Sequence, residues 1–153
     1  MEAIANFTLA KHDGPYESWP LATEVFRDGV ATGRKLPGFV LDAQYEHGGF
    51  YLFVTSWDCP FEESLEVVLT DSDLRIVDRK SIGVMYSSTW LEACEVVSAN
   101  QLRLQCDSDR VFRVTVQSGR LSLKRLHAGA DSTASLLRAG ARRATATPWW
   151  RFW

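Results

Sequence analysis

The densest group of chemically reactive side chains is the run 57–63, Trp-Asp-Cys-Pro-Phe-Glu-Glu. Cys59 could act there as a nucleophile, or Glu62 and Glu63 as an acid/base pair. Acidic neighbours disfavour a thiolate, however, and two adjacent residues of a strand point to opposite faces of its sheet. The run is more typical of a turn that is capped by Asp58, with both glutamates facing water. We therefore expect Cys59 not to be catalytic.

A histidine and an acid stand side by side at His12-Asp13, within the segment 11–20. A His-Asp pair belongs to the catalytic triad of serine hydrolases. Residues that are adjacent in sequence rarely orient each other, and the chain has no GxSxG nucleophile motif. Gly14-Pro15 and Trp19-Pro20 indicate instead a loop between the first two strands.

The chain has three cysteines and three histidines at irregular spacing. This pattern predicts neither a disulfide framework nor a zinc site, and we expect no cofactor and no metal. Cys94 and Cys106 fall on neighbouring predicted strands. A three-residue turn between these strands would place the thiols opposite each other, with Val96 opposite Leu104, whereas a two-residue turn would put the thiols on opposite faces. We interpret both as small buried thiols.

The elements that must position these side chains are mainly strands. Short apolar runs alternate with turn residues, which is typical of an all-β sandwich or barrel. We expect an antiparallel, meander-rich barrel or two-sheet sandwich, optionally with one short C-terminal helix, and a β-rich α+β domain as the runner-up. The stretch from Gly29 to Gly38, with Arg34, Lys35 and Pro37 between its glycines, is interpreted as a flexible polar loop, with an anion site as the alternative. The expected strands are 3–9, 21–27, 38–46, 50–57, 63–70, 73–79, 91–98, 101–106, 110–117 and 120–126.

Turn residues also predict strand registers. Asp71-Ser72 and Ser118-Gly119 each fit a two-residue hairpin turn, and the glycines at 48–49 join the matching apolar faces of 41–45 and 50–54. The four strands from 91 to 126 are expected to form a meander. The expected facing pairs are Leu69 with Leu74, Val67 with Ile76, Val116 with Leu121, and Val114 with Leu123.

The segment 50–57 is apolar on both faces, which an antiparallel strand with one wet face would not be. We therefore expect a central strand, with one face on the core and the other covered by the C-terminal tail or by a partner. If the fold is a ligand-binding barrel, Tyr51 and Phe53 could line the site, or alternatively the set Phe50, Leu52 and Val54.

Charge divides the chain into an acidic body and a basic tail. Residues 1–119 hold 10 Lys/Arg and 18 Asp/Glu, whereas residues 120–153 hold 7 Lys/Arg and 1 Asp. We expect a single β domain over 1–127 and a basic, aromatic tail over 128–153, with a short helix from Asp131 to about Ala139. The final residues, with Arg142, Trp150 and Trp153 among them, resemble short tryptophan- and arginine-rich cationic peptides of membrane interfaces. That resemblance implies an interfacial segment, although we rank docking on the chain's own sheet, or on a second copy, ahead of membrane contact.

The sequence contains no catalytic motif, so the leading functional hypothesis is a non-catalytic binding protein with an acidic body, such as a small bacterial-type inhibitor or immunity protein. The alternatives are a β-barrel that binds a small apolar ligand and an enzyme that uses the Asp58–Glu63 loop. We expect a basic protein partner, a homodimer through the tail as an option, no nucleic acid, no membrane contact and a cytoplasmic location. The candidate binding residues are Asp58, Glu62, Glu63, Tyr51, Phe53, Trp150 and Trp153.

Overall fold

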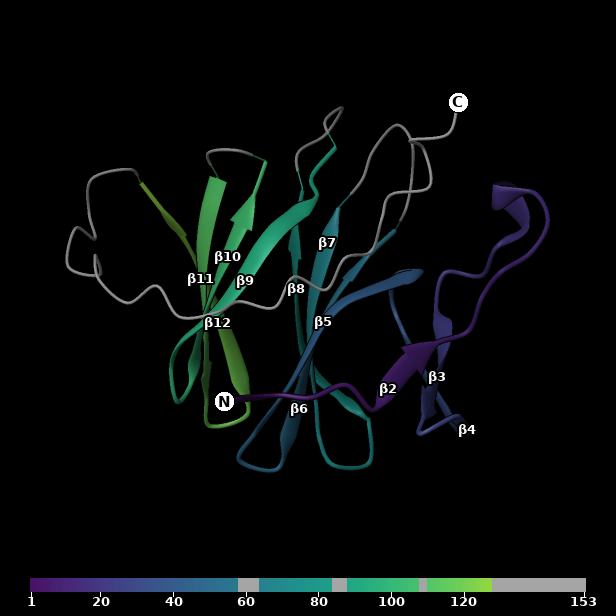
Figure 1. Cartoon of the computed structure of the whole chain (residues 1–153), viewed down its shortest axis with the longest axis horizontal. Coiled ribbons are helices and arrows are strands. Elements are labelled where there is room, and N and C mark those ends of the chain that lie inside the picture. Colours follow the sequence, from purple (N-terminus) through teal and green to yellow (C-terminus); the bar gives the residue numbers. More distant parts are fainter. Residues whose placement is uncertain (58–63, 84–87, 108–109, 128–153) are drawn as a thin grey trace.

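The alternating pattern folds into three antiparallel β-sheets that are stacked as three layers (Figure 1). The computed structural model describes residues 1–57, 64–83, 88–107 and 110–127. Within these ranges no helix is long and apolar enough to cross a membrane. The elements are β1 (Glu2–Ala3), β2 (Phe7–Leu9), the 3-10 turn η1 (Tyr16–Ser18), β3 (Thr23–Arg27), β4 (Val30–Leu36), β5 (Val40–His47), β6 (Phe50–Ser56), β7 (Leu65–Thr70), β8 (Ile76–Ile82), β9 (Leu91–Ser98), β10 (Gln101–Cys106), β11 (Arg110–Gln117) and β12 (Arg120–Leu126).

The central sheet has the order β1-β5-β6-β7-β8, and its inner strands β6 and β7 are buried on both faces. One face packs on the C-terminal sheet, of order β12-β11-β10-β9, and the other on the N-terminal sheet, of order β2-β3-β4. We call the core between the central and C-terminal sheets the first core, and the core between the central and N-terminal sheets the second core. Leu52 and Val54 of β6 enter the first core, while Tyr51 and Phe53 enter the second. The expectation that β6 is central is therefore confirmed. Its second face is covered by the chain's own N-terminal sheet, which corrects the expected cover by the tail or a partner.

The N-terminal segment serves two sheets rather than forming the single strand expected over 3–9. Glu2 and Ala3 pair with β5, and residues 7–9 pair with β3. Where the chain crosses over, the Gln44 amide replaces a missing strand partner: its Oε1 accepts from the Phe7 backbone N–H at 3.0 Å and its Nε2 donates to the Phe7 carbonyl at 3.0 Å. This pair of hydrogen bonds fastens the third layer to the central sheet.

The hairpin predicted at Ser118-Gly119 is confirmed, with Val116 opposite Leu121. Both turn residues have positive φ, 50° and 70°, which suits a primed turn. Around Gly48-Gly49 the expected matching is found for Tyr45 with Leu52 and Ala43 with Val54, but a bulge after Leu41 places that residue opposite Thr55 and against the other core. Strands β9 to β12 form the expected meander.

The register predicted at Asp71-Ser72 is wrong, although β7 and β8 do form a hairpin. Thr70 faces Ile76, so the connection is longer and carries a bulge. The Asp71 carboxylate accepts hydrogen bonds from the backbone N–H groups of Asp73 and Arg75, both at 2.9 Å, which organises a wider turn. Leu74 consequently enters the second core instead of the first, and Ile76 is 46% exposed.

Strand β4 lies where the sequence indicated a polar loop. Asp28-Gly29, with φ values of 50° and 79°, forms the tight turn that joins it to β3. It is an edge strand of a small sheet. Its exposure alternates from Ala31 to Leu36, but Leu36 is its one buried residue, so its apolar residues do not alternate in the sequence. A bulge opposite Val25-Phe26 interrupts its pairing further.

The register between Cys94 and Cys106 differs from both alternatives. Cys94 faces Leu104, and Cys106 faces Leu91, because bulges shift the pairing at both ends of β10. Both thiols are free. Cys106 is fully buried and Cys94 half-buried, which is close to the expected buried pair.

Candidate binding site

Five aromatic side chains gather where the long loop before β3 meets the starts and ends of the central strands. We call them the aromatic patch: His12, Tyr16, Trp19, Phe39 and Trp57. Phe39 lies at the centre, with ring centroids 5.3, 5.7, 5.1 and 5.2 Å from those of His12, Tyr16, Trp19 and Trp57 respectively. All four contacts are edge-to-face, at interplanar angles of 76° to 87°. Such pairs contribute about 0.5–1.5 kcal/mol each beyond the area they bury.

The backbone at 37–39 holds Phe39 in place. The Pro37 carbonyl accepts from the Thr55 hydroxyl at 2.7 Å, and the Phe39 N–H donates to the Ser56 carbonyl at 2.7 Å. Gly38 has φ of 93°, and a Cβ there would lie 2.7 Å from the Thr55 hydroxyl oxygen and 2.9 Å from the Ser56 carbonyl oxygen. Only glycine fits this conformation in this space. The turn thus holds Phe39 beside Ser56, the last residue of β6, which precedes Trp57 in the sequence.

A hydrogen-bonded chain orients His12 within the patch. The Thr23 hydroxyl donates to the Gly38 carbonyl at 2.6 Å and lies 2.9 Å from His12 Nε2. Because a hydroxyl has one proton to donate, the proton between His12 and Thr23 must be on Nε2. This hydrogen bond orients the ring, whose centroid lies 5.4 Å from that of Trp19.

The loop that carries Tyr16 and Trp19 is closed on itself. The Trp19 indole N–H donates to the Gly14 carbonyl at 3.2 Å, and its backbone N–H donates to the Tyr16 carbonyl at 3.0 Å. Ser18 adds a side-chain hydrogen bond to the Pro15 carbonyl at 2.7 Å. Tyr16 remains 38% exposed and Trp19 is partly exposed. Two aromatic rings are therefore displayed on a preformed turn.

Trp57 connects the patch to a buried carboxylate. Its indole N–H donates to Glu66 Oε1 at 3.2 Å, while Glu66 Oε2 accepts from Arg79 Nε at 2.8 Å and from the Ser81 hydroxyl at 2.6 Å. The Glu66 side chain is 4% exposed. Burial acts to raise the pKa of Glu66, but the hydrogen bonds from Arg79, Ser81 and Trp57 outweigh it and lower the pKa. Glu66 is thus an ionised anchor for Trp57.

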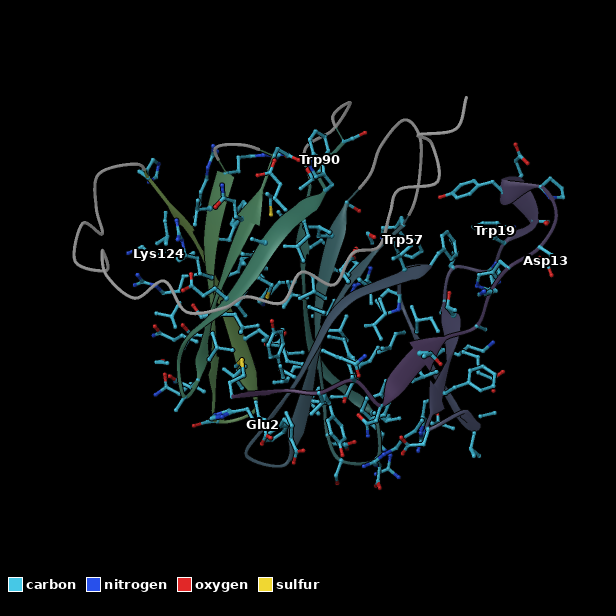
Figure 2. All side chains as sticks on the ribbon, viewed as in Figure 1. Glu2, Asp13, Trp19, Trp57, Trp90 and Lys124 are labelled. Atoms are coloured by element: carbon cyan, nitrogen blue, oxygen red, sulfur yellow. The ribbon has the colours of Figure 1, made fainter. Side chains whose placement is uncertain are left out.

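The loop that carries Tyr16 and Trp19 has two exposed carboxylates and one exposed cation, Lys11. Asp13 and Glu17 lie on the same loop and are exposed. Figure 2 shows Asp13 and Trp19 together at one end of the molecule, on the loop beside the N-terminal sheet. Aromatic faces beside carboxylates attract cations, because the ring quadrupole and the negative charge act in the same direction. The arrangement can bind a guanidinium or ammonium group without any bond being made or broken.

Of the binding residues that the sequence nominated, the structure describes Tyr51 and Phe53. Tyr51 and Phe53 fill the second core, 8% and 0% exposed, against Phe7 at centroid distances of 5.0 and 5.2 Å. The loop residues Asp58, Cys59, Glu62 and Glu63, the tail residues Trp150 and Trp153, and the helix expected from Asp131 lie outside the described residues.

Phe39 and Glu66 were missed by the sequence reasoning. Glu66 did leave a signal, because a glutamate interrupts the apolar run 65–69 of a central strand, where an ionised group must be paired. Phe39 left a weaker signal in its position directly after Pro37-Gly38. Conversely, the segment 11–20 and Trp57 were both singled out as unusual, but nothing in their spacing placed them together.

The described thiols do not have the properties of nucleophiles. Burial raises the pKa of Cys94 to about 11, despite the hydrogen bond from the Tyr45 hydroxyl at 3.1 Å. Burial likewise raises the pKa of Cys106 to about 11. Both are protonated at neutral pH, whereas a nucleophilic cysteine needs a lowered pKa. Within the described ranges, no three His, Cys, Asp or Glu side chains are grouped so that they could hold a metal ion.

A hollow of about 350 Å³ lies between the tips of the β5-β6 and β11-β12 hairpins. Its walls include His47, Phe50 and Val116. Phe50 was among the side chains expected to line a ligand site, but Leu52 and Val54 are fully buried in the first core. Of the side chains that the sequence nominated for a ligand site, Phe50 alone lines this hollow.

Comparison with known proteins finds no matching family model, no matching curated protein and no matching solved structure.

Proposed function

We propose that this protein is a non-catalytic binding domain that takes an arginine- or lysine-containing segment of a partner protein on its aromatic patch. The observation that carries the proposal is the display of Tyr16 and Trp19 on a closed turn, edge-on around Phe39 and beside Asp13 and Glu17. Tryptophan and tyrosine are enriched at the energetic centres of protein interfaces. A cation over such rings contributes about 0.5–1 kcal/mol when exposed and about 2 kcal/mol when desolvated.

Preorganisation supports the proposal. Binding costs free energy when loops and side chains must be ordered, about 0.5–1.5 kcal/mol for each flexible side chain. Here Trp19 is held by Gly14, His12 by Thr23, and Trp57 by Glu66, so the rings are oriented before a partner arrives. An unneeded surface loop would not require this network of hydrogen bonds.

Charge supports a basic partner. Residues 1–119 hold eight more Asp/Glu than Lys/Arg. Charge of this sign increases the association rate with a basic protein more than it sets the affinity. A small inhibitor or immunity-type protein, which must reach a basic partner quickly and mask it, would use such a surface.

The proposal is tested with a fluorescein-labelled arginine hexapeptide and the full chain, by fluorescence anisotropy. Loss of two rings worth about 1 kcal/mol each should weaken binding roughly thirtyfold in the double variant Tyr16→Ala, Trp19→Ala. The matched control is Trp90→Ala, because Trp90 is 48% exposed but lies outside the patch. Equal binding by the double variant and the control, with both folded by circular dichroism, would overturn the proposal. A labelled glutamate hexapeptide should not bind.

A further inference from the structure

The outer face of the C-terminal sheet carries three cations in one row across adjacent strands. Arg103 on β10 is directly opposite Arg113 on β11, which is directly opposite Lys124 on β12. Their strand neighbours Leu102, Leu104 and Val114 are buried in the first core, and Leu123, beside Lys124, is partly buried against it, so by alternation the three cations point away from this core. We call Arg103, Arg113 and Lys124 the basic row.

Strand geometry sets the dimensions of the basic row. Adjacent strands are about 4.8 Å apart, so the three cations span roughly 10 Å of a flat surface. Glu95 on β9 continues the row and lies 3.9 Å from Arg103. Arg120, four residues before Lys124 on β12, faces the same side by alternation with the buried Leu121. Positive charge therefore dominates the middle of this face, although the chain as a whole is acidic.

The rows beside the basic row are polar on one side and partly apolar on the other. Gln101, Thr115 and Ser122 form the polar row. Val111 and Leu126 face each other on the opposite side. A protein interface normally has an apolar centre with charges at its rim, and this face has the reverse order. Guanidinium, ammonium, amide and hydroxyl groups together are the donors that proteins use for phosphate oxygens.

We propose that this face binds the phosphodiester backbone of a nucleic acid without sequence preference. The net charge of the chain predicts no nucleic-acid binding, but that sum conceals a local concentration of cations that only the strand pairing reveals. Figure 2 shows Lys124 at the opposite end of the molecule from Asp13 and Trp19, so the face is separate from the aromatic patch. The proposal is therefore independent of the proposed protein-binding function.

The test uses the full chain and a fluorescein-labelled oligothymidylate of about 20 nucleotides, measured by anisotropy. The affinity should fall with salt, with a slope of log K against log salt of about −2, as expected for three phosphate contacts to a single strand. The variant Arg103→Gln, Arg113→Gln, Lys124→Gln should bind about tenfold more weakly or worse. The matched control Lys11→Gln, Lys35→Gln, Arg75→Gln removes the same charge from exposed cations elsewhere and should lose less than about threefold.

Each outcome decides the proposal. Both variants retain the basic tail, so a selective loss in the basic-row variant assigns the binding to the sheet face. A cooperative melting transition in both variants shows that they are folded. If the basic-row variant shows no such transition, the single variant Lys124→Gln is measured in its place. Equal losses in both variants, an unchanged affinity in the basic-row variant, or no binding by the parent chain at low salt would each overturn the proposal. Binding to phosphatidylserine vesicles is measured with the same proteins. If the basic-row variant loses vesicle binding but keeps its affinity for the oligonucleotide, the face serves a membrane and the proposal is overturned.

Discussion

Replacing Glu66 by glutamine should destabilise the protein by about 2–3 kcal/mol at neutral pH. The carboxylate accepts three hydrogen bonds, from Trp57, Arg79 and Ser81. An amide can place its oxygen toward Trp57 or toward Arg79, but its nitrogen then meets the other donor. Breaking a buried ion pair costs about 3–5 kcal/mol. The Arg79 side chain is 45% exposed and can recover water, which places the expected cost below that range.

The stability contributed by Glu66 should depend on pH with a definite sign. The pKa of Glu66 is lower in the folded protein than its ordinary value of 4.5, because its hydrogen bonds outweigh burial. The folded state therefore binds its proton less readily than the unfolded state does. The stabilisation is complete above pH 4.5 and is lost as pH falls through the lowered value. The difference between Glu66→Gln and the parent chain should accordingly shrink in acid.

Urea denaturation of both proteins between pH 7 and pH 3 measures this directly, with the free energy of unfolding taken from linear extrapolation. Glu95→Gln is the matched control, because the Glu95 side chain is 69% exposed and its change should stay within about 0.5 kcal/mol. A cost for Glu66→Gln below about 0.5 kcal/mol at pH 7 would refute the hydrogen-bond network. A cost that does not change with pH would refute the argument from the pKa.

Three further perturbations test the packing and the chemistry. Val67 is fully buried, so Val67→Ala should lower the free energy of unfolding in urea by about 2–3 kcal/mol. Ile76 is half exposed, so Ile76→Ala should lower it by less than about 1 kcal/mol. Equal costs would contradict the observed register. Gly38→Ala should cost more than about 2 kcal/mol from strain and overlap with β6, and a neutral effect on the melting temperature would contradict the described turn. Cys94, with its pKa raised to about 11, should react with iodoacetamide at pH 7 far more slowly in the native protein than in urea, and equal rates would count against its burial.

The strand ranges of the C-terminal meander and the β11-β12 register could be predicted because the connections are short, whereas bulges at both ends of β10 made the predicted β9-β10 register wrong. The expected ranges 91–98, 101–106, 110–117 and 120–126 coincide with β9 to β12. Strand β10 alternates clearly against a single core, and Ser118-Gly119 closes the β11-β12 hairpin with a two-residue loop, so few registers compete there.

The N-terminal third was harder to predict because it forms a third layer. Strand β4 is polar and at an edge, so the alternation of apolar residues that identifies a half-buried strand is missing. Outside this third, the register of the β7-β8 hairpin was also missed. The Asp71 carboxylate accepts two backbone hydrogen bonds there and makes the turn wider than the two-residue turn that Asp71-Ser72 indicated. The aromatic patch depends on contacts between His12, Phe39 and Trp57, which are far apart in the chain, and local spacing carries no information on such contacts.

The most direct measurement of the central claim is a titration of the isotope-labelled chain with the arginine hexapeptide, followed through the tryptophan indole N–H signals in ¹H–¹⁵N spectra. The chain has six tryptophans, and each signal is assigned by replacing one tryptophan with phenylalanine. If the aromatic patch binds the cation, the signals of Trp19 and Trp57 move together and saturate, while that of the exposed Trp90 stays in place. If Trp90 or the C-terminal tryptophans move and Trp19 and Trp57 do not, the aromatic patch is not the binding site.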